Sequence, residues 1–234
     1  MTLLMLLACA GTSDDTPGDD TSAPDTADTA AEDPCTAFWS FTVGTNWSYR
    51  YTDEDFPGSF ATEIQSQNDD GTFVVVSASE QVNDSESLTM TWRTQEWTWS
   101  CDAEGLYRHD GSIWTLREHE GGSNEYTTTY AANAPAMMWA HDLEVGSTWT
   151  RTFDYVITDE DGWEDDWTSS VAMSVTMRGE HVVPAGTFNS VRVKVGDEHE
   201  AWVTEGPGEL RMNKIQVDST SDYELTAFEP GSPD

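Results

Sequence analysis

The sequence has few cations, and this scarcity limits what the protein can bind. Only 10 of its 234 residues are lysine or arginine, against 44 aspartates and glutamates, so the formal net charge is −34 at pH 7. The cations are scattered singly along the chain and form no basic cluster. Because such a surface repels phosphate backbones and anionic headgroups at long range, we expect no nucleic acid partner.

The sequence also lacks the motifs that identify common enzymes and cofactor sites. It has no Gly-x-Ser-x-Gly elbow, no His-Glu-x-x-His, no glycine-rich phosphate loop and no Cys-x-x-Cys. Its five histidines lie far apart in the chain. We therefore expect a non-enzymatic protein without catalytic residues or a cofactor. A hydrolase whose site is invisible in the sequence is an alternative.

No apolar run is long enough to cross a membrane as a helix. Residues 2–8, TLLMLLA, form a short apolar run that ends at Cys9. Residues 10–34 then contain only Gly, Thr, Ser, Asp, Pro, Ala and Glu. Such a segment cannot bury enough apolar surface to offset its ordering entropy, so we expect residues 9–34 to form a disordered acidic tether.

The segment Leu6-Leu7-Ala8-Cys9 resembles the lipobox of bacterial lipoproteins, in which a signal peptide is cut before a cysteine that is then lipidated. The resemblance implies a signal segment over residues 1–8, a lipid on Cys9 and a membrane anchor. Alanine after that cysteine implies the outer membrane of a Gram-negative cell. We therefore expect a protein of the cell envelope, on its periplasmic or surface face.

Cysteine is scarce, with three residues in the chain. If Cys9 carries a lipid, Cys35 and Cys101 remain as an even pair in an oxidising compartment. We predict that these two form a disulfide. Two free buried thiols are the alternative.

The strand signal is clearest in residues 182–212. There Val191, Val193 and Val195 alternate with Arg192 and Lys194, which is typical of a half-buried antiparallel strand. Similar alternation recurs along much of the chain, and it predicts an all-β fold with little or no helix.

Turn residues separate these expected strands. Asn68-Asp69-Asp70-Gly71 predicts a hairpin, and Asp110-Gly111 predicts another that places Tyr107 opposite Trp114. Residues 131–141 are the segment in which one helical turn is plausible.

A sequence pattern from the first half of the chain repeats near its middle. Val145-Gly146-Ser147-Thr148-Trp149 repeats the pattern of Val43-Gly44-Thr45-Asn46-Trp47, and each copy precedes strands, a Gly-Thr-Phe and a tryptophan-bearing strand. We therefore expect one β domain over residues 35–228, with two tandem half-units as an option at about 38–130 and 141–228. A frayed tail is expected at residues 229–234.

Together with Glu104-Gly105-Leu106 and the Pro-Ala-Gly-Thr-Phe run at residues 184–188, this pattern resembles uncharacterised bacterial lipoproteins over residues 38–228. The resemblance implies a strongly curved antiparallel sheet, a half-barrel similar to the lipoprotein carriers LolA and LolB. The sequence lacks the clear helices that plug the open face of those carriers. Only the sheet is therefore carried over, and lipoprotein transport is not.

Aromatic residues and arginines supply the candidate ligand site. An inward arginine among tryptophans can hold the anionic head of a lipid or sugar acid, because its guanidinium stacks on rings and forks toward oxygens. The alternative is a tryptophan core whose arginines reach solvent. The candidate residues are Arg93, Trp97, Trp99, Tyr107, Trp114, Trp149 and Arg151.

An acidic stretch at residues 159–166 offers a candidate Ca²⁺ site, because Ca²⁺ takes six to eight oxygen ligands in flexible geometry. Its spacing does not match an EF-hand, and a solvated turn is the alternative. The candidate metal ligands are Asp159, Asp161, Asp165 and Asp166.

These observations lead to one functional expectation. The sequence indicates a membrane-tethered, non-enzymatic β module outside the cytoplasm that binds an amphipathic ligand or a protein partner. A purely structural surface lipoprotein with an acidic exterior is the alternative.

Overall fold

The computed structural model describes residues 35, 40–52, 57–85, 88–214 and 222–232. All of these residues belong to one compact unit, Glu32–Asp234. The predicted signal segment, the lipidation site at Cys9 and the tether lie outside the described residues.

Within the described residues all thirteen elements are β-strands. The first six are β1 (Asn46–Tyr51), β2 (Gly58–Gln67), β3 (Phe73–Ser85), β4 (Leu88–Cys101), β5 (Gly105–His119) and β6 (Gly122–Ala132). The short β7 (Ala136–Ala140) follows. The last six are β8 (Thr148–Asp159), β9 (Glu164–Val183), β10 (Gly186–Val195), β11 (His199–Thr204), β12 (Gly208–Lys214) and β13 (Tyr223–Glu229).

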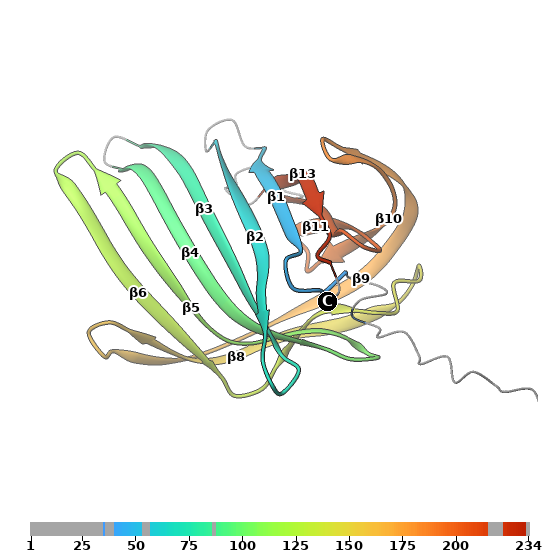
Figure 1. Ribbon diagram of the computed structural model, residues 1–234, viewed down its shortest axis with the longest axis horizontal. Helices are drawn as coiled ribbons and strands as arrows, with labels where there is room; N and C mark the ends of the chain where they lie inside the picture. The colour runs from blue at the N-terminus through green and yellow to red at the C-terminus, as the bar shows by residue number, and fades with distance from the viewer. Residues whose placement is uncertain (1–34, 36–39, 53–56, 86–87, 215–221, 233–234) are drawn as a thin grey trace, which may run out of the picture. The chain divides into compact units, whose positions relative to one another are not determined.

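The strands form one antiparallel sheet that closes on itself. Each strand from β1 to β6 pairs with the next, β6 pairs with β8, and pairing continues in order to β13, which returns to β1. Twelve strands therefore make a closed barrel, and β7 pairs with one end of β5. Figure 1 shows the long strands β2 to β6 side by side as one curved wall. The all-β antiparallel fold is confirmed, but the pairing closes where the sequence predicted a half-barrel.

The two predicted half-units fall on six consecutive strands each, β1–β6 and β8–β13. Their entry turns are built alike. The amide of Gly44 donates to the carbonyl of Ile64 at 2.8 Å, and the amide of Gly146 donates to the carbonyl of Val175 at 2.9 Å. Both glycines have a positive φ, 85° and 102°, a conformation that favours glycine. The repeat as such stays a prediction.

The predicted turn at Asp110-Gly111 is wrong, because β5 runs straight through it. A Cβ at Gly111 would stand 2.2 Å from Cε3 of Trp97, so the indole ring lies directly over this glycine. The glycine therefore allows close approach of a ring rather than a turn. Tyr107 pairs across the sheet with Ser100 and Met137 instead of Trp114.

Two further segments differ from expectation. Residues 131–141 contain strand β7 rather than a helical turn, because β7 pairs with the first residues of β5. Contacts with the rest of the barrel continue past residue 228, where the sequence predicted a frayed tail. Glu229 pairs with Asn46, and the amide of Gly231 donates to Oγ1 of Thr45 at 2.9 Å.

The aliphatic core lies mainly on the strands of the second half. Val191, Val193 and Val195 are buried, with 3%, 0% and 8% of their surface exposed, which confirms the predicted alternation in β10. They join Val203 and Leu225 in one core cluster. The first half contributes mostly aromatic rings to the same interior, and this difference positions the cavity described below.

A disulfide joins Cys35 to Cys101 at the end of β4, as the sequence predicts, with Cα atoms 5.7 Å apart. Cys35→Ser should lower the free energy of unfolding by about 4 kcal/mol, because the bond closes a loop of 66 residues in the unfolded chain. Denaturation in guanidinium under oxidising conditions measures this loss. Cys9→Ser is the matched control and should change nothing; an equal loss in the control would contradict the assignment.

Gly111→Ala should destabilise the protein by about 1–3 kcal/mol, because the new methyl group displaces the ring of Trp97. Gly179→Ala, in β9, is the control, since no atom lies within 4 Å of its added Cβ. Urea denaturation followed by tryptophan fluorescence measures both. Equal stability of the two variants would show that the ring does not need the glycine.

Candidate functional site

A cavity of about 190 Å³ lies among the aromatic residues of the interior. Its walls come from β1 to β5, from β7, β12 and β13, and from the segment before β1. Eight aromatic residues line it: Phe41, Trp47, Tyr49, Phe60, Trp97, Trp99, Trp139 and Tyr223. The other lining residues are Thr62, Val75, Ser77, Leu106, Pro207, Gly208 and Glu209.

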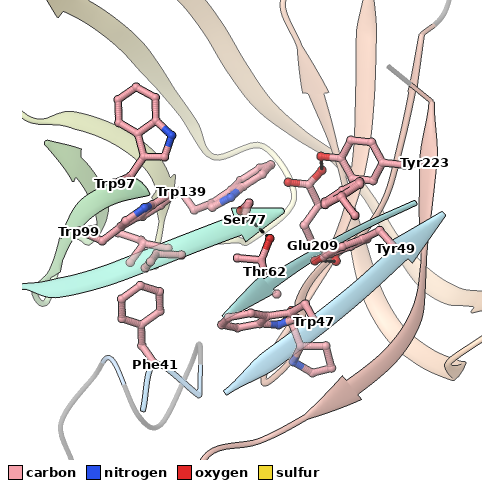
Figure 2. Close-up of a pocket in the computed structure, with 15 residues that line it drawn as sticks. Phe41, Trp47, Tyr49, Thr62, Ser77, Trp97, Trp99, Trp139, Glu209 and Tyr223 are labelled. Carbon is pink, nitrogen blue, oxygen red and sulfur yellow. Dashed lines mark hydrogen bonds between the residues drawn. The ribbon is translucent and has the colours of Figure 1, made fainter. Parts of the chain in front are cut away.

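The cavity has two unlike sides. Figure 2 shows Trp97, Trp99 and Trp139 together on one side, and Glu209 with Tyr223 on the other. Between these two sides, the hydroxyls of Thr62 and Ser77 form a hydrogen bond of 2.8 Å. Rings therefore line both ends of the cavity, and one end also carries a carboxyl group.

Strand alternation explains why these rings face inward. Trp47 and Tyr49 are two residues apart on β1, and so are Trp97 and Trp99 on β4, so each pair shares one face of the sheet. The register of β4 against β5 shifts between Trp97 and Trp99, and such bulges re-aim side chains. Nε1 of Trp47 donates to the carbonyl of Pro207 at 2.7 Å, which fixes its ring.

Glu209 supplies the carboxyl group of the site. Tyr223 donates a short hydrogen bond to Oε1 of Glu209, and the hydroxyl of Tyr49 donates to the backbone carbonyl of Glu209 at 3.0 Å. Burial raises the pKa of Glu209, while the Tyr223 bond and the positive charge of Arg151 oppose that rise. Burial also raises the pKa of Tyr49 and Tyr223 well above the ordinary value, so both phenols stay neutral. Within the described chain, Oε2 of Glu209 has no hydrogen bond and remains available to a ligand.

Arg151 lies next to the cavity without lining it. It is 7% exposed, one terminal nitrogen donates to the carbonyl of Met138 at 2.9 Å, and its guanidinium lies 5.1 Å from the ring centre of Trp139. Burial lowers its pKa to about 10, so it remains charged at neutral pH. Three of the buried side-chain nitrogens that have no acceptor among the described residues lie in or beside the cavity: Nε of Arg151, Nε1 of Trp99 and Nε1 of Trp149.

The structure brings together some of the seven predicted ligand residues. Trp97 and Trp99 line the cavity, and Trp149 packs on Trp139 at 6.3 Å between ring centres. Arg151 packs on the same Trp139 ring.

The other three predicted ligand residues lie elsewhere. Arg93 and Trp114 line a wider groove of about 730 Å³ between β1 and β5. Tyr107 follows Leu106, which lines the cavity, so it points to the opposite face of β5.

Several residues of the cavity were missed in the sequence. The alternation of Trp47 with Tyr49 was visible and could have suggested that both face inward. Glu209 gave no such signal, because it follows Gly206-Pro207-Gly208 and looks like one of many surface carboxylates. Tyr223 likewise becomes its partner only through the pairing of β12 with β13.

The predicted Ca²⁺ site is not supported. No cluster of His, Cys, Asp or Glu suited to a metal ion occurs in the described residues. Asp159 instead caps the turn between β8 and β9, since its carboxylate accepts the amides of Asp161 and Trp163 at 3.0 and 2.8 Å. Asp165 and Asp166 are neighbours on β9, so their side chains point to opposite faces.

One serine–histidine pair bears on the hydrolase alternative. Oγ of Ser100 lies 2.6 Å from Nε2 of His109. Hydrogen bonds from Thr72 lower the pKa of Asp70, and the charge of His109 lowers it by a smaller amount. Neither Ser100 nor His109 lines the cavity. Ser100 follows Trp99 on β4 and so faces away from it. A hydrolase needs such a pair beside a substrate pocket and oxyanion donors, and the cavity residues do not supply the pair.

Comparison with known proteins gives no relative for this chain. No family model matches it, and no curated protein or solved structure matches it. The likeness to bacterial lipoproteins therefore stays a prediction from the residues. Across the part of the chain that the structure describes, no helix has the length and apolar character needed to span a membrane.

Glu209→Gln should gain stability relative to the wild type as pH rises. The folded protein holds the Glu209 proton more tightly than the unfolded chain does, so the carboxyl contributes less to the free energy of unfolding above its ordinary pKa of 4.5. Urea denaturation of both proteins in steps from about pH 4.5 to neutrality measures the difference. Glu205→Gln, at an exposed position, is the control. The same dependence on pH in the two variants would contradict a buried carboxyl at Glu209.

Proposed function

We propose that this protein is a non-enzymatic binding module of the cell envelope that holds a small amphipathic ligand in the barrel cavity. The observation that carries the proposal is the aromatic cavity with one carboxyl group at its end. Ligand sites are typically concave and mostly apolar, with a few placed polar groups that orient the ligand. The eight rings would hold the apolar body, and Glu209 with Tyr223 would orient the polar group.

The size of the cavity limits the ligand. The cavity has a volume of about 190 Å³. An apolar cavity of about 150 Å³ in another protein holds benzene. The ligand part that enters this cavity is therefore a molecule of that size, or one end of a longer molecule.

The envelope location rests on the sequence. The Leu-Leu-Ala-Cys segment, the acidic tether of residues 10–34 and the pairing of Cys35 with Cys101 together support a lipid anchor at Cys9 and an oxidising compartment. The outer membrane, on its periplasmic or surface face, is the proposed site. The acidic exterior would keep such a module soluble beside the membrane.

A purely structural role is the second candidate. The aliphatic half of the interior is well buried, since Val193, Val203, Leu210 and Leu225 have no exposed surface. If the aromatic cavity only completed this core, the acidic surface would be the functional feature. The two candidates differ in whether the cavity is occupied when the protein is isolated.

Native mass spectrometry of the full chain separates them. The protein is produced in a Gram-negative host without added ligand and measured before and after acid unfolding. We expect an additional mass of a small molecule that is lost on unfolding, together with acyl mass that Cys9→Ser removes. The structural role would be favoured if every preparation had the mass of the polypeptide alone and the protein also bound none of a set of small amphipathic compounds.

A further inference from the structure

We propose that the cavity binds a small organic cation, a quaternary ammonium or protonated amine, between its tryptophan rings and the carboxylate of Glu209. This inference rests on the proposed binding function and names its ligand class. Three independent features support it: the ring lining, the charge of the lining residues and the charge of the whole chain.

The rings form the first part of the site. An aromatic face is negative at its centre, so it attracts a cation by about 0.5–2 kcal/mol, and tryptophan is the strongest of the three ring types. Four tryptophans line this cavity, Trp47, Trp97, Trp99 and Trp139. Arg108 already lies 4.1 Å from the ring centre of Trp97, and Arg151 lies 5.1 Å from that of Trp139. Among the described residues no cation lies on Trp47 or Trp99, so these two rings are the ones available to a ligand cation.

The charge of the lining residues is the second part. Among the described residues that line the cavity, Glu209 is the sole carboxylate, and none is lysine or arginine. Tyr223 occupies Oε1 of Glu209, which leaves Oε2 for a cationic group. A contact between an ammonium group and this oxygen is charge-assisted and stronger than a neutral hydrogen bond.

Arg151 weakens this attraction without cancelling it. It lowers the pKa of Glu209 through space, but the two groups form no ion pair in the described structure. The guanidinium is held by the carbonyl of Met138 and by the ring of Trp139. A ligand cation at Oε2 would therefore meet a carboxylate that no other cation contacts directly.

The net charge of −34 is the third part. A field of this sign raises the local concentration of cations and repels anions, and it speeds association at low salt. The unpartnered Nε1 of Trp99 offers a donor to an acceptor ligand. One neutral donor is a weaker determinant than a carboxylate, so the observations favour the cation.

Three probes of the same shape and different charge test the inference. Choline is the cation, 3,3-dimethyl-1-butanol is its uncharged isostere, and 3,3-dimethylbutyrate is the related anion. Each is titrated into the full chain by calorimetry and by tryptophan fluorescence. We expect choline to bind at least tenfold tighter than the alcohol, and the anion to bind most weakly.

The variant Glu209→Gln tests whether the carboxylate causes the preference for choline over the alcohol. This variant should reduce the choline-to-alcohol preference about tenfold, and the exposed Glu205→Gln should keep it. In the wild type, choline binding should weaken as pH falls through the pKa of Glu209, because Tyr49 and Tyr223 stay neutral and Arg151 stays charged over that range. The alcohol should show no such dependence.

The possible outcomes distinguish failure of the cation inference from failure of the proposed binding function. Equal binding of choline and the alcohol would overturn the cation and keep an apolar binding site. Tightest binding of the butyrate would overturn it in favour of an anion. Binding of none of the three probes would overturn the inference together with the proposed function. Flotation with phosphatidylcholine vesicles that Glu209→Gln weakens and Glu205→Gln does not would support the cation and place it on a lipid headgroup.

Discussion

Closure of the sheet is the constraint on which the rest of this structure depends. Because β13 returns to β1 and β4 pairs with β5, each of the twelve ring strands has a hydrogen-bonded neighbour on both sides. Closure removes the unpaired edges that invite aggregation, and it gives the sheet an inner face. Alternation then sorts residues into an interior and an acidic exterior, so a closed barrel with a net charge of −34 can still hold a large apolar interior.

The interior is filled unequally, and the cavity follows from that inequality. Branched aliphatic side chains on β10 to β13 are well buried, with Val193, Val203 and Leu225 fully buried. The facing strands β1 to β5 carry flat, rigid rings instead. Rings meet at fixed angles, such as the 48° between Phe41 and Trp99, and they cannot fill the space between them as flexible side chains would. The space that remains is the proposed binding site.

Two charged side chains that are largely removed from water, Glu209 and Arg151, lie in or beside this space. Taking Glu209 and Arg151 out of water is costly, and each lacks the ion pair that would offset the cost within the described structure. Apolar residues at both positions would make a more stable core. A binding role gives these two residues a reason to be there, whereas a purely structural barrel does not.

The sequence by itself determined the elements with local signals. The valine alternation in β10, the Asn-Asp-Asp-Gly hairpin between β2 and β3, and the pairing of Cys35 with Cys101 were all predictable, since each depends on a short pattern or on counting. Local signals failed at Gly111, whose role depends on a ring from the neighbouring strand, and in β7, which is a strand only because β5 pairs with it. Tertiary structure alone decided the closure and the site. Trp47 bonds to Pro207 and Tyr49 to Glu209 across 160 residues of sequence, and which distant strands meet is set by backbone pairing around the whole ring.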